Sequence, residues 1–289
     1  MGDPPRALRA VSGLRTWAFV LPIMLAGFAV FAIASSFAEQ LWDADVASGL
    51  AVQVKAVESI PPQGSRTARV VVIIGTSLIR AATQGSGSQD EFPPSIQLVV
   101  ITGKQGTAPV EDLMPALLRA HPDLVLLETN LIRRPPPDDT PLIVRRARHV
   151  QWALLTNHNH FWAPTCTGRV GRIPAKVRGT HEQYQSLFAS ADPSLDRLPL
   201  LAELKAGGIQ VGVLDMPRAT ELETAAPNLV RWRNIVGAAA EKQGVGMWSA
   251  PGYWPVDYFC DLSHLNYDGA LVFHKWLVGR LEQALNLPQ

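Results

Sequence analysis

Short runs of apolar residues, many of them β-branched, recur along the chain from residue 68 onward. Each run is continuously apolar rather than alternating, which is typical of a strand buried on both faces of a parallel sheet. The predicted strands are Ala68–Ile74, Leu98–Thr102, Asp123–Leu127, Ile209–Leu214 and Val245–Ser249. Apolar residues return at helical spacing in Val110–Ala120, Asn228–Lys242 and Tyr267–Leu285. Strands that alternate with helices predict an α/β fold, in which helices cover both faces of a parallel sheet of these five strands.

The N-terminal stretch Thr16–Phe37 carries no charge and is long enough to cross a bilayer as a helix. Basic residues precede it and acidic residues follow it, namely Arg6, Arg9 and Arg15 on one side and Glu39, Asp43 and Asp45 on the other. Because positive charge stays on the cytoplasmic side, the body of the protein is expected to face the periplasm or cell exterior. A single-pass anchor in the inner (cytoplasmic) membrane is predicted. The alternative is a cleaved signal peptide that ends near Ser36–Ala38.

The rest of the chain is predicted to form one α/β domain with an insertion. Residues 1–38 are assigned to the cytoplasmic tip and anchor, and residues 39–66 to a connector with a helix within Leu41–Ile60. The α/β domain then occupies residues 67–289, and its insertion at about 133–204 is expected to hold two or more helices.

The charge balance argues against one class of function, and the cysteine content bears on the compartment. The chain has 26 Lys and Arg against 25 Asp and Glu, so it lacks the basic excess expected of a general nucleic-acid-binding protein. Its two cysteines, Cys166 and Cys260, fit an oxidising compartment. A disulfide between them and two separate buried thiols are both open interpretations.

Residues able to carry out chemistry follow several of the predicted strands. Gly75–Ser77 follows the first strand, Gly103 the second and Glu128–Asn130 the third, and Asp261 and His264 come after the fifth. Because the carboxyl ends of parallel strands meet at one edge of a sheet, and ligands bind there, these residues are expected to converge.

The convergent residues supply the parts of an acyl-transfer site. A serine hydroxyl is a poor nucleophile until an imidazole takes its proton, and a carboxylate orients that imidazole. We therefore expect Ser77 to be the nucleophile, His264 the base and then the acid, and Asp261 its orienting partner. The backbone N–H groups of Ser77 and Gly103 and the side-chain amide of Asn130 are candidate donors to an oxyanion.

Simpler interpretations exist for each residue. Ser77 could be an ordinary helix N-cap, and Asn130 and Gly103 could be turn residues, with Gly106 a rival for the oxyanion role. The segment Asn157–His160 invites a metal site, but two histidines at i, i+2 do not share a helix face, and no carboxylate or cysteine pair stands nearby at ligand spacing. Neither a metal nor another cofactor is predicted.

Four short blocks resemble the SGNH (GDSL-like) hydrolase superfamily in their order along the chain. They are GTSL at Gly75–Leu78, TGKQGT at Thr102–Thr107, LLETN at Leu126–Asn130 and DLSH at Asp261–His264. The resemblance extends over about Val70–Leu285. It implies a flavodoxin-like three-layer α/β/α sandwich and carboxylic ester chemistry through an acyl-Ser77 intermediate.

Two positions depart from the superfamily pattern. Thr76 stands where many members have aspartate, and Glu128 where many have glycine. The Glu128 carboxylate is expected to reach into the site and contact substrate, or to signal a changed or lost activity. Arg80, one helical turn past Ser77, is a further candidate substrate contact; its alternative is an ion pair with Glu128.

The anchor and extracytoplasmic domain resemble the membrane-tethered branch of the superfamily. That branch includes the D-alanyl transfer protein of teichoic-acid synthesis and O-acetyl transferases of exported polysaccharides, which often work beside a membrane-bound O-acyltransferase. The resemblance implies an esterase or O-acyltransferase that acts on a cell-envelope or exported glycan. The alternative function is a non-catalytic scaffold or glycan-binding partner of a membrane-bound O-acyltransferase.

Overall fold

The structure is a computed structural model that describes residues 6–84, 92–102, 109–133, 141–155 and 194–287. The chain divides into two compact units. The first comprises residues 1–47 and 137–159, and the second comprises residues 48–136 and 160–289. The second unit contains the whole sheet.

The sheet has five parallel strands in the order β2-β1-β3-β4-β5. They are β1 (Arg69–Gly75), β2 (Ile96–Thr102), β3 (Leu124–Glu128), β4 (Gln210–Asp215) and β5 (Gly246–Ser249). All five predicted strands are confirmed, with ends that shift by one or two residues. β1 lies between β2 and β3, and its Ile73 pairs with Val100 on one side and Leu126 on the other.

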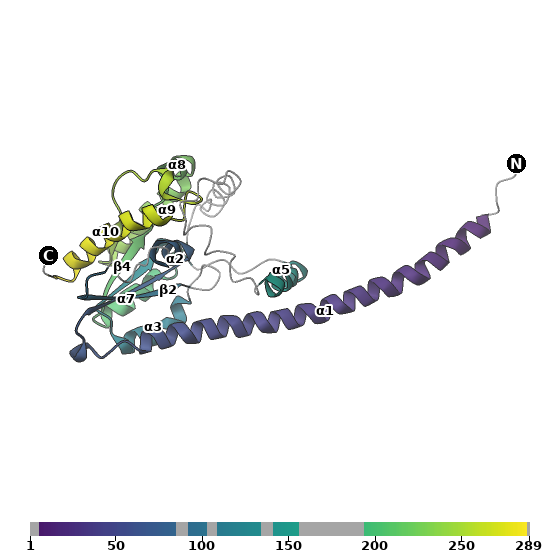
Figure 1. The fold of residues 1–289 in the computed structure, drawn as a ribbon, viewed down its shortest axis with the longest axis horizontal. Helices are drawn as coiled ribbons and strands as arrows, with labels where there is room; N and C mark the ends of the chain where they lie inside the picture. Colours follow the sequence, from purple (N-terminus) through teal and green to yellow (C-terminus); the bar gives the residue numbers. More distant parts are fainter. Residues whose placement is uncertain (1–5, 85–91, 103–108, 134–140, 156–193, 288–289) are drawn as a thin grey trace. The chain divides into compact units, whose positions relative to one another are not determined.

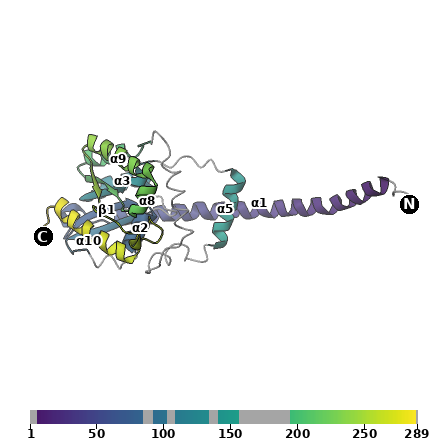
Figure 2. The same cartoon turned by 90° about the horizontal axis from the view of Figure 1, so that it is seen from above.

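Helices cover both faces of this sheet, as the sequence predicts. The helices on one face are α2 (Ser77–Gln84), α8 (Thr220–Ala225) and α10 (Tyr267–Ala284), and those on the other are α3 (Val110–Ala120), α7 (Leu198–Ala206) and α9 (Pro227–Lys242). Figure 2 shows β1 between α2 and α10 on one side and α3 and α9 on the other. Along β1, Val71 and Ile73 enter the first core and Val72 and Ile74 the second, because successive side chains of a strand point to opposite faces. The fold is a three-layer α/β sandwich.

The strand order locates the edge where a ligand site is expected. From β1 the chain crosses to β2 on one side, and then to β3 on the other side of β1. This reversal makes the gap between the carboxyl ends of β1 and β3 the topological switch point of a flavodoxin-like sheet. Ser77 follows β1 and Asn130 follows β3.

The N-terminal helix is longer than the sequence predicts. α1 (Arg6–Glu58) runs without a break through the predicted anchor, where it contains Pro22, and on into the predicted connector (Figure 1). No further proline stands before residue 61, so nothing of that kind ends the helix earlier. Among the described residues it is the one helix long and apolar enough to cross a membrane. Large apolar side chains such as Phe28 and Ile33 are 66% and 72% exposed. At its other end, Val57 is buried in the core of the second unit.

Two described helices begin within the range of the predicted insertion. α5 (Leu142–Leu155) belongs to the first unit, and α7 begins near the insertion's end. Residues 156–193 lie outside the described residues.

Candidate active site

The nucleophile turn joins β1 to α2. Gly75 ends the strand, and Ser77 is the first helical residue. The Leu78 N–H donates to Thr76 Oγ1 at 3.2 Å, which is the bond of a helix N-cap. Thr76 therefore caps α2, and the Ser77 hydroxyl is left for other contacts.

Asp261 and His264 make their contact inside one tight loop. His264 Nδ1 lies 2.8 Å from Asp261 Oδ2, and the His264 backbone N–H donates to Asp261 Oδ1 at 2.8 Å. The backbone N–H and the hydroxyl of Ser263 both donate to the same Oδ1 at 3.1 Å. The carboxylate is thus fixed by four groups from its own loop.

This loop is held closed at its ends and against its neighbours. Phe259 and Leu265 form an antiparallel bridge, and the Cys260 N–H donates to the His264 carbonyl at 2.9 Å. Leu262 adopts a left-handed conformation with φ 74°, which is costly for a non-glycine residue. Its carbonyl accepts from the Ala219 N–H at 2.9 Å, so the loop after β4 helps to hold the strained turn.

Ser77 meets His264 across the site although the two are 187 positions apart in the chain. Ser77 Oγ lies 2.9 Å from His264 Nε2. An ionised Asp261 can only accept hydrogen bonds, so Nδ1 must carry the ring proton, and Nε2 is left as the acceptor for the Ser77 hydroxyl. The three side chains stand in the order that serine activation requires.

The Asp261 carboxyl is held ionised. Its burial alone would raise its pKa, but the hydrogen bonds and positive field of His264 and the N–H of Ser263 lower the pKa from 3.8 to about 2. The negative charge therefore orients the imidazole, and it is placed to stabilise a positive charge on that ring.

Glu128 occupies a different place from the one expected. It is fully buried at the end of β3 and accepts from the Thr76 N–H at 2.6 Å and from the Thr76 hydroxyl at 2.9 Å. The expectation that Glu128 reaches into the site and contacts substrate is wrong, because its carboxyl lies behind the nucleophile turn with no exposed surface. Burial raises its pKa, although the Thr76 hydrogen bonds and the charges of Arg218 and His264 act the other way.

Arg80 lies on α2, one turn past Ser77, as the sequence predicts. Its Nε and Nη2 donate to Thr102 Oγ1 at 3.2 Å and 3.1 Å, at the carboxyl end of β2. Contact with substrate stays a prediction for this residue.

Several predicted positions fall outside the described residues. Among them are the candidate oxyanion donor Gly103 and its rival Gly106, the segment Asn157–His160, and Cys166. Cys260 is buried beside Asp261, and its pairing with Cys166 stays a prediction.

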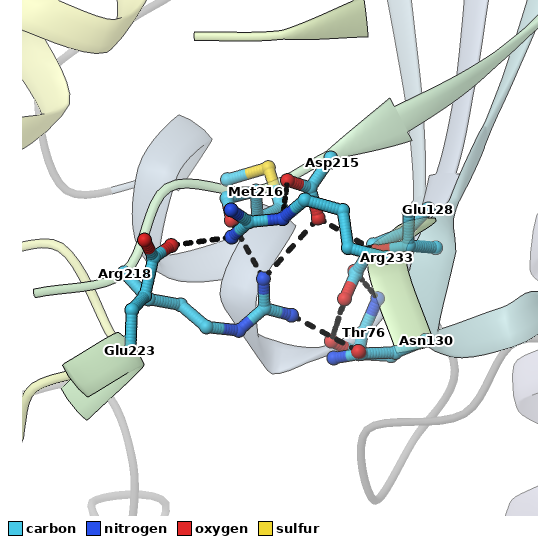
Figure 3. A network of polar contacts seen from close by, with 9 residues as sticks. Thr76, Glu128, Asn130, Asp215, Met216, Arg218, Glu223 and Arg233 are labelled. Atoms are coloured by element: carbon cyan, nitrogen blue, oxygen red, sulfur yellow. Dashed lines mark hydrogen bonds and ion pairs between the residues drawn. The ribbon is translucent and has the colours of Figure 1, made fainter. Parts of the chain in front are cut away.

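Asn130 is described, and its surroundings contain residues that the sequence interpretation missed. Asn130 lies in the short helix α4 (Thr129–Ile132), and Arg218 Nη2 donates to its Oδ1 at 3.0 Å. Figure 3 shows this contact as part of a chain of polar groups. The further members are Thr129, Asp215, Arg233 and Glu223. Asp215 and Arg218 follow the predicted fourth strand at the same sheet edge, which is the sequence signal that could have revealed them.

The described residues thus bring a serine hydroxyl, an imidazole and a carboxylate together at the switch point of the sheet. Comparisons with protein-family models, with curated proteins and with solved structures find no match to this chain. Its chemistry has to be inferred from the site itself.

Proposed function

We propose that this protein is a serine acyl-ester enzyme that works through an acyl-Ser77 intermediate. The observation that carries the proposal is the 2.9 Å contact between Ser77 Oγ and His264 Nε2, with Asp261 behind the imidazole at 2.8 Å. The order of the sequence blocks, which resembles the SGNH hydrolases, supports the same chemistry.

The reaction proceeds in two steps. Ser77 Oγ attacks the ester carbonyl carbon while its proton passes to His264 Nε2, and the bond to the leaving alcohol then breaks as His264 returns that proton to the alkoxide. In the second step a water or a sugar hydroxyl gives its proton to His264 and attacks the acyl-serine. The Ser77 ester bond then breaks as His264 returns the proton to Ser77 Oγ, and the product is a free acid or a new ester.

Negative charge develops on the carbonyl oxygen in both steps. The Ser77 N–H stands at the N-terminus of α2, where unpaired N–H groups and the helix dipole favour an anion. The Asn130 side-chain amide follows the adjacent strand and supplies a second donor. Removal of one such donor costs about 2.7–4 kcal/mol of transition-state stabilisation in a comparable site.

The substrate is proposed to be an acyl ester of a cell-envelope or exported glycan. α1 is apolar enough to anchor the chain in the inner membrane, and Arg6, Arg9 and Arg15 before its apolar stretch favour a cytoplasmic N-terminus. The sheet unit would then face the periplasm or cell exterior. A membrane-bound O-acyltransferase is the corresponding partner if the acyl group is transferred rather than hydrolysed.

The test is turnover of an aryl acetate by the full-length chain in detergent. Ser77→Ala and His264→Ala are each expected to lose about 10⁴-fold or more in kcat, whereas Ser65→Ala, an exposed serine remote from the site, keeps wild-type turnover. If folded Ser77→Ala retains wild-type turnover, the proposal fails. A folded wild-type protein without any turnover would favour the non-catalytic scaffold.

A further inference from the structure

Arg218 is a charged side chain in the interior of the sheet unit. Its guanidinium is fully buried, and it lies in the loop that follows β4. A buried charge is costly unless it is paired and hydrogen-bonded, so its partners identify what the residue is for. Those partners include the Asp215 carboxylate at 3.3 Å, the Met216 carbonyl at 2.8 Å and Asn130 Oδ1 at 3.0 Å.

The contact with Asn130 determines which way its amide faces. A guanidinium has only N–H donors, so the Asn130 atom that faces Arg218 must be the carbonyl oxygen. The NH₂ group of the same amide then lies on the other branch of the side chain, turned away from the guanidinium. If the amide were flipped, its NH₂ group would face the N–H donors of Arg218. Its carbonyl oxygen would then face the oxyanion, which needs a donor.

The guanidinium is itself held in place. Asp215, at the end of β4, pairs with Arg218 and also with Arg233 at 2.5 Å, and it accepts from the Thr129 hydroxyl at 3.1 Å. Arg233 continues the chain to Glu223 near the surface. The two arginines and the carboxylates of Asp215 and Glu223 balance in charge (Figure 3). Thr129 is the neighbour of Asn130 in α4.

We propose that Arg218 is a positioning residue of the active site, which acts on the reaction through Asn130. It holds the Asn130 amide with its NH₂ group available to the oxyanion, so that the donor does not have to be reoriented in the transition state. This inference rests on the proposed function and goes beyond it, because Arg218 itself is buried and need not touch substrate.

The test is a double-mutant cycle on the full-length chain in detergent, with aryl acetate turnover as the readout. Arg218→Met and Asn130→Ala are each expected to lower kcat by about 10²–10³-fold with a small change in KM. In the Asn130→Ala background, Arg218→Met should change kcat by less than about threefold, because the amide through which it acts is gone.

Arg66→Met is the matched control, because it removes another buried arginine side chain from its carboxylate partner, Asp123, which precedes β3 and lies outside the Asn130 network. It is expected to lower the melting temperature while kcat stays within about threefold of wild type. Should Arg218→Met fail to fold, Arg218→Lys keeps a positive charge beside Asp215 and allows the same cycle.

Two results would overturn the proposal. One is a double variant whose fold-loss in kcat equals the product of the fold-losses of Arg218→Met and Asn130→Ala. The other is a fall in kcat for Arg66→Met as large as that for Arg218→Met. Failure of the proposed function itself is recognised separately, since folded Ser77→Ala would then keep wild-type turnover.

Discussion

At the residue scale, the proposed activation of Ser77 depends on which ring nitrogen of His264 carries the proton. Asp261 accepts from His264 Nδ1, and this leaves Nε2 without a proton to face Ser77. Because its pKa is lowered to about 2, Asp261 stabilises the folded protein above its ordinary pKa of 3.8, and that contribution is lost as the pH falls through about 2. Loss of activity on acidification above pH 4 is therefore not expected to come from protonation of Asp261.

Asp261→Asn should retain the fold and lose most of the activity. An asparagine amide can donate to Nδ1, which would move the ring proton to Nε2 and remove the acceptor for the Ser77 hydroxyl. The expected loss in kcat is about 10⁴-fold, as for the same change in a comparable triad. Aryl acetate turnover measures it, with circular dichroism as the control for folding. A variant that keeps a tenth of wild-type turnover would contradict the assigned role.

Glu128→Gln is expected to change the pH dependence of stability. Because the folded-state pKa of Glu128 is raised above the ordinary value of 4.5, the folded protein keeps a proton that the unfolded chain loses above that pH. This lowers the free energy of unfolding by about 1.4 kcal/mol per pH unit until the folded-state pKa is reached. Urea unfolding at pH 4, 6 and 8 should show Glu128→Gln gaining stability relative to wild type as the pH rises. A constant difference would mean that folding does not raise the pKa of Glu128.

At the element scale, the carboxyl ends of the strands bring the site together. The strands were predictable because a strand buried on both faces is continuously apolar, and the Asp261–His264 pair because it is local in sequence. The role of Arg218 was not predictable, because nothing in the sequence distinguishes a buried arginine after a strand from a solvated one. Glu128 was misplaced for a similar reason: the sequence shows a carboxylate at the end of the third strand, but not that it turns toward Thr76.

Gly75→Ala should disturb the junction of β1 and α2. A Cβ at Gly75 would lie 2.1 Å from Ile79 Cγ1 and 2.9 Å from Glu128 Oε2, so α2 must move for the side chain to fit. The expected cost is about 1–3 kcal/mol in the free energy of unfolding, together with a fall in kcat as Ser77 moves from His264. Urea unfolding and aryl acetate turnover measure the two effects.

Gly279→Ala is the control for this change. It lies in α10, where an added Cβ meets nothing within 4 Å, and alanine is the better helix former. It should leave turnover unchanged and raise stability by up to about 1 kcal/mol. Equal effects of the two substitutions would argue against the close approach of α2 to β1.

At the scale of the whole molecule, α1 joins an apolar stretch to the sheet unit. Its exposed apolar side chains include Phe28 and Ile33, whereas Val57 near its other end lies in the core of the sheet unit. The sequence predicted the apolar stretch from its composition. It did not predict an unbroken helix through residue 58, because polar residues after Phe37 suggested a separate connector.

An uncleaved anchor predicts that the full-length protein stays with membranes after an alkaline carbonate wash. Deletion of residues 1–38 should release the protein into the soluble fraction, since the apolar stretch is then gone. The intact mass of the membrane-bound protein should include the N-terminal residues. A mature protein that begins near Ala38 would show instead that the stretch is a signal peptide.

The most direct test of the central claim is covalent labelling of the full-length protein by a fluorophosphonate, with the labelled residue mapped by peptide mass spectrometry. The probe requires an activated serine, so the label is expected on Ser77, to be absent from Ser77→Ala and to be strongly slowed in His264→Ala. A folded wild-type protein that takes up no label, or takes it up at another residue, would contradict the claim that His264 activates Ser77.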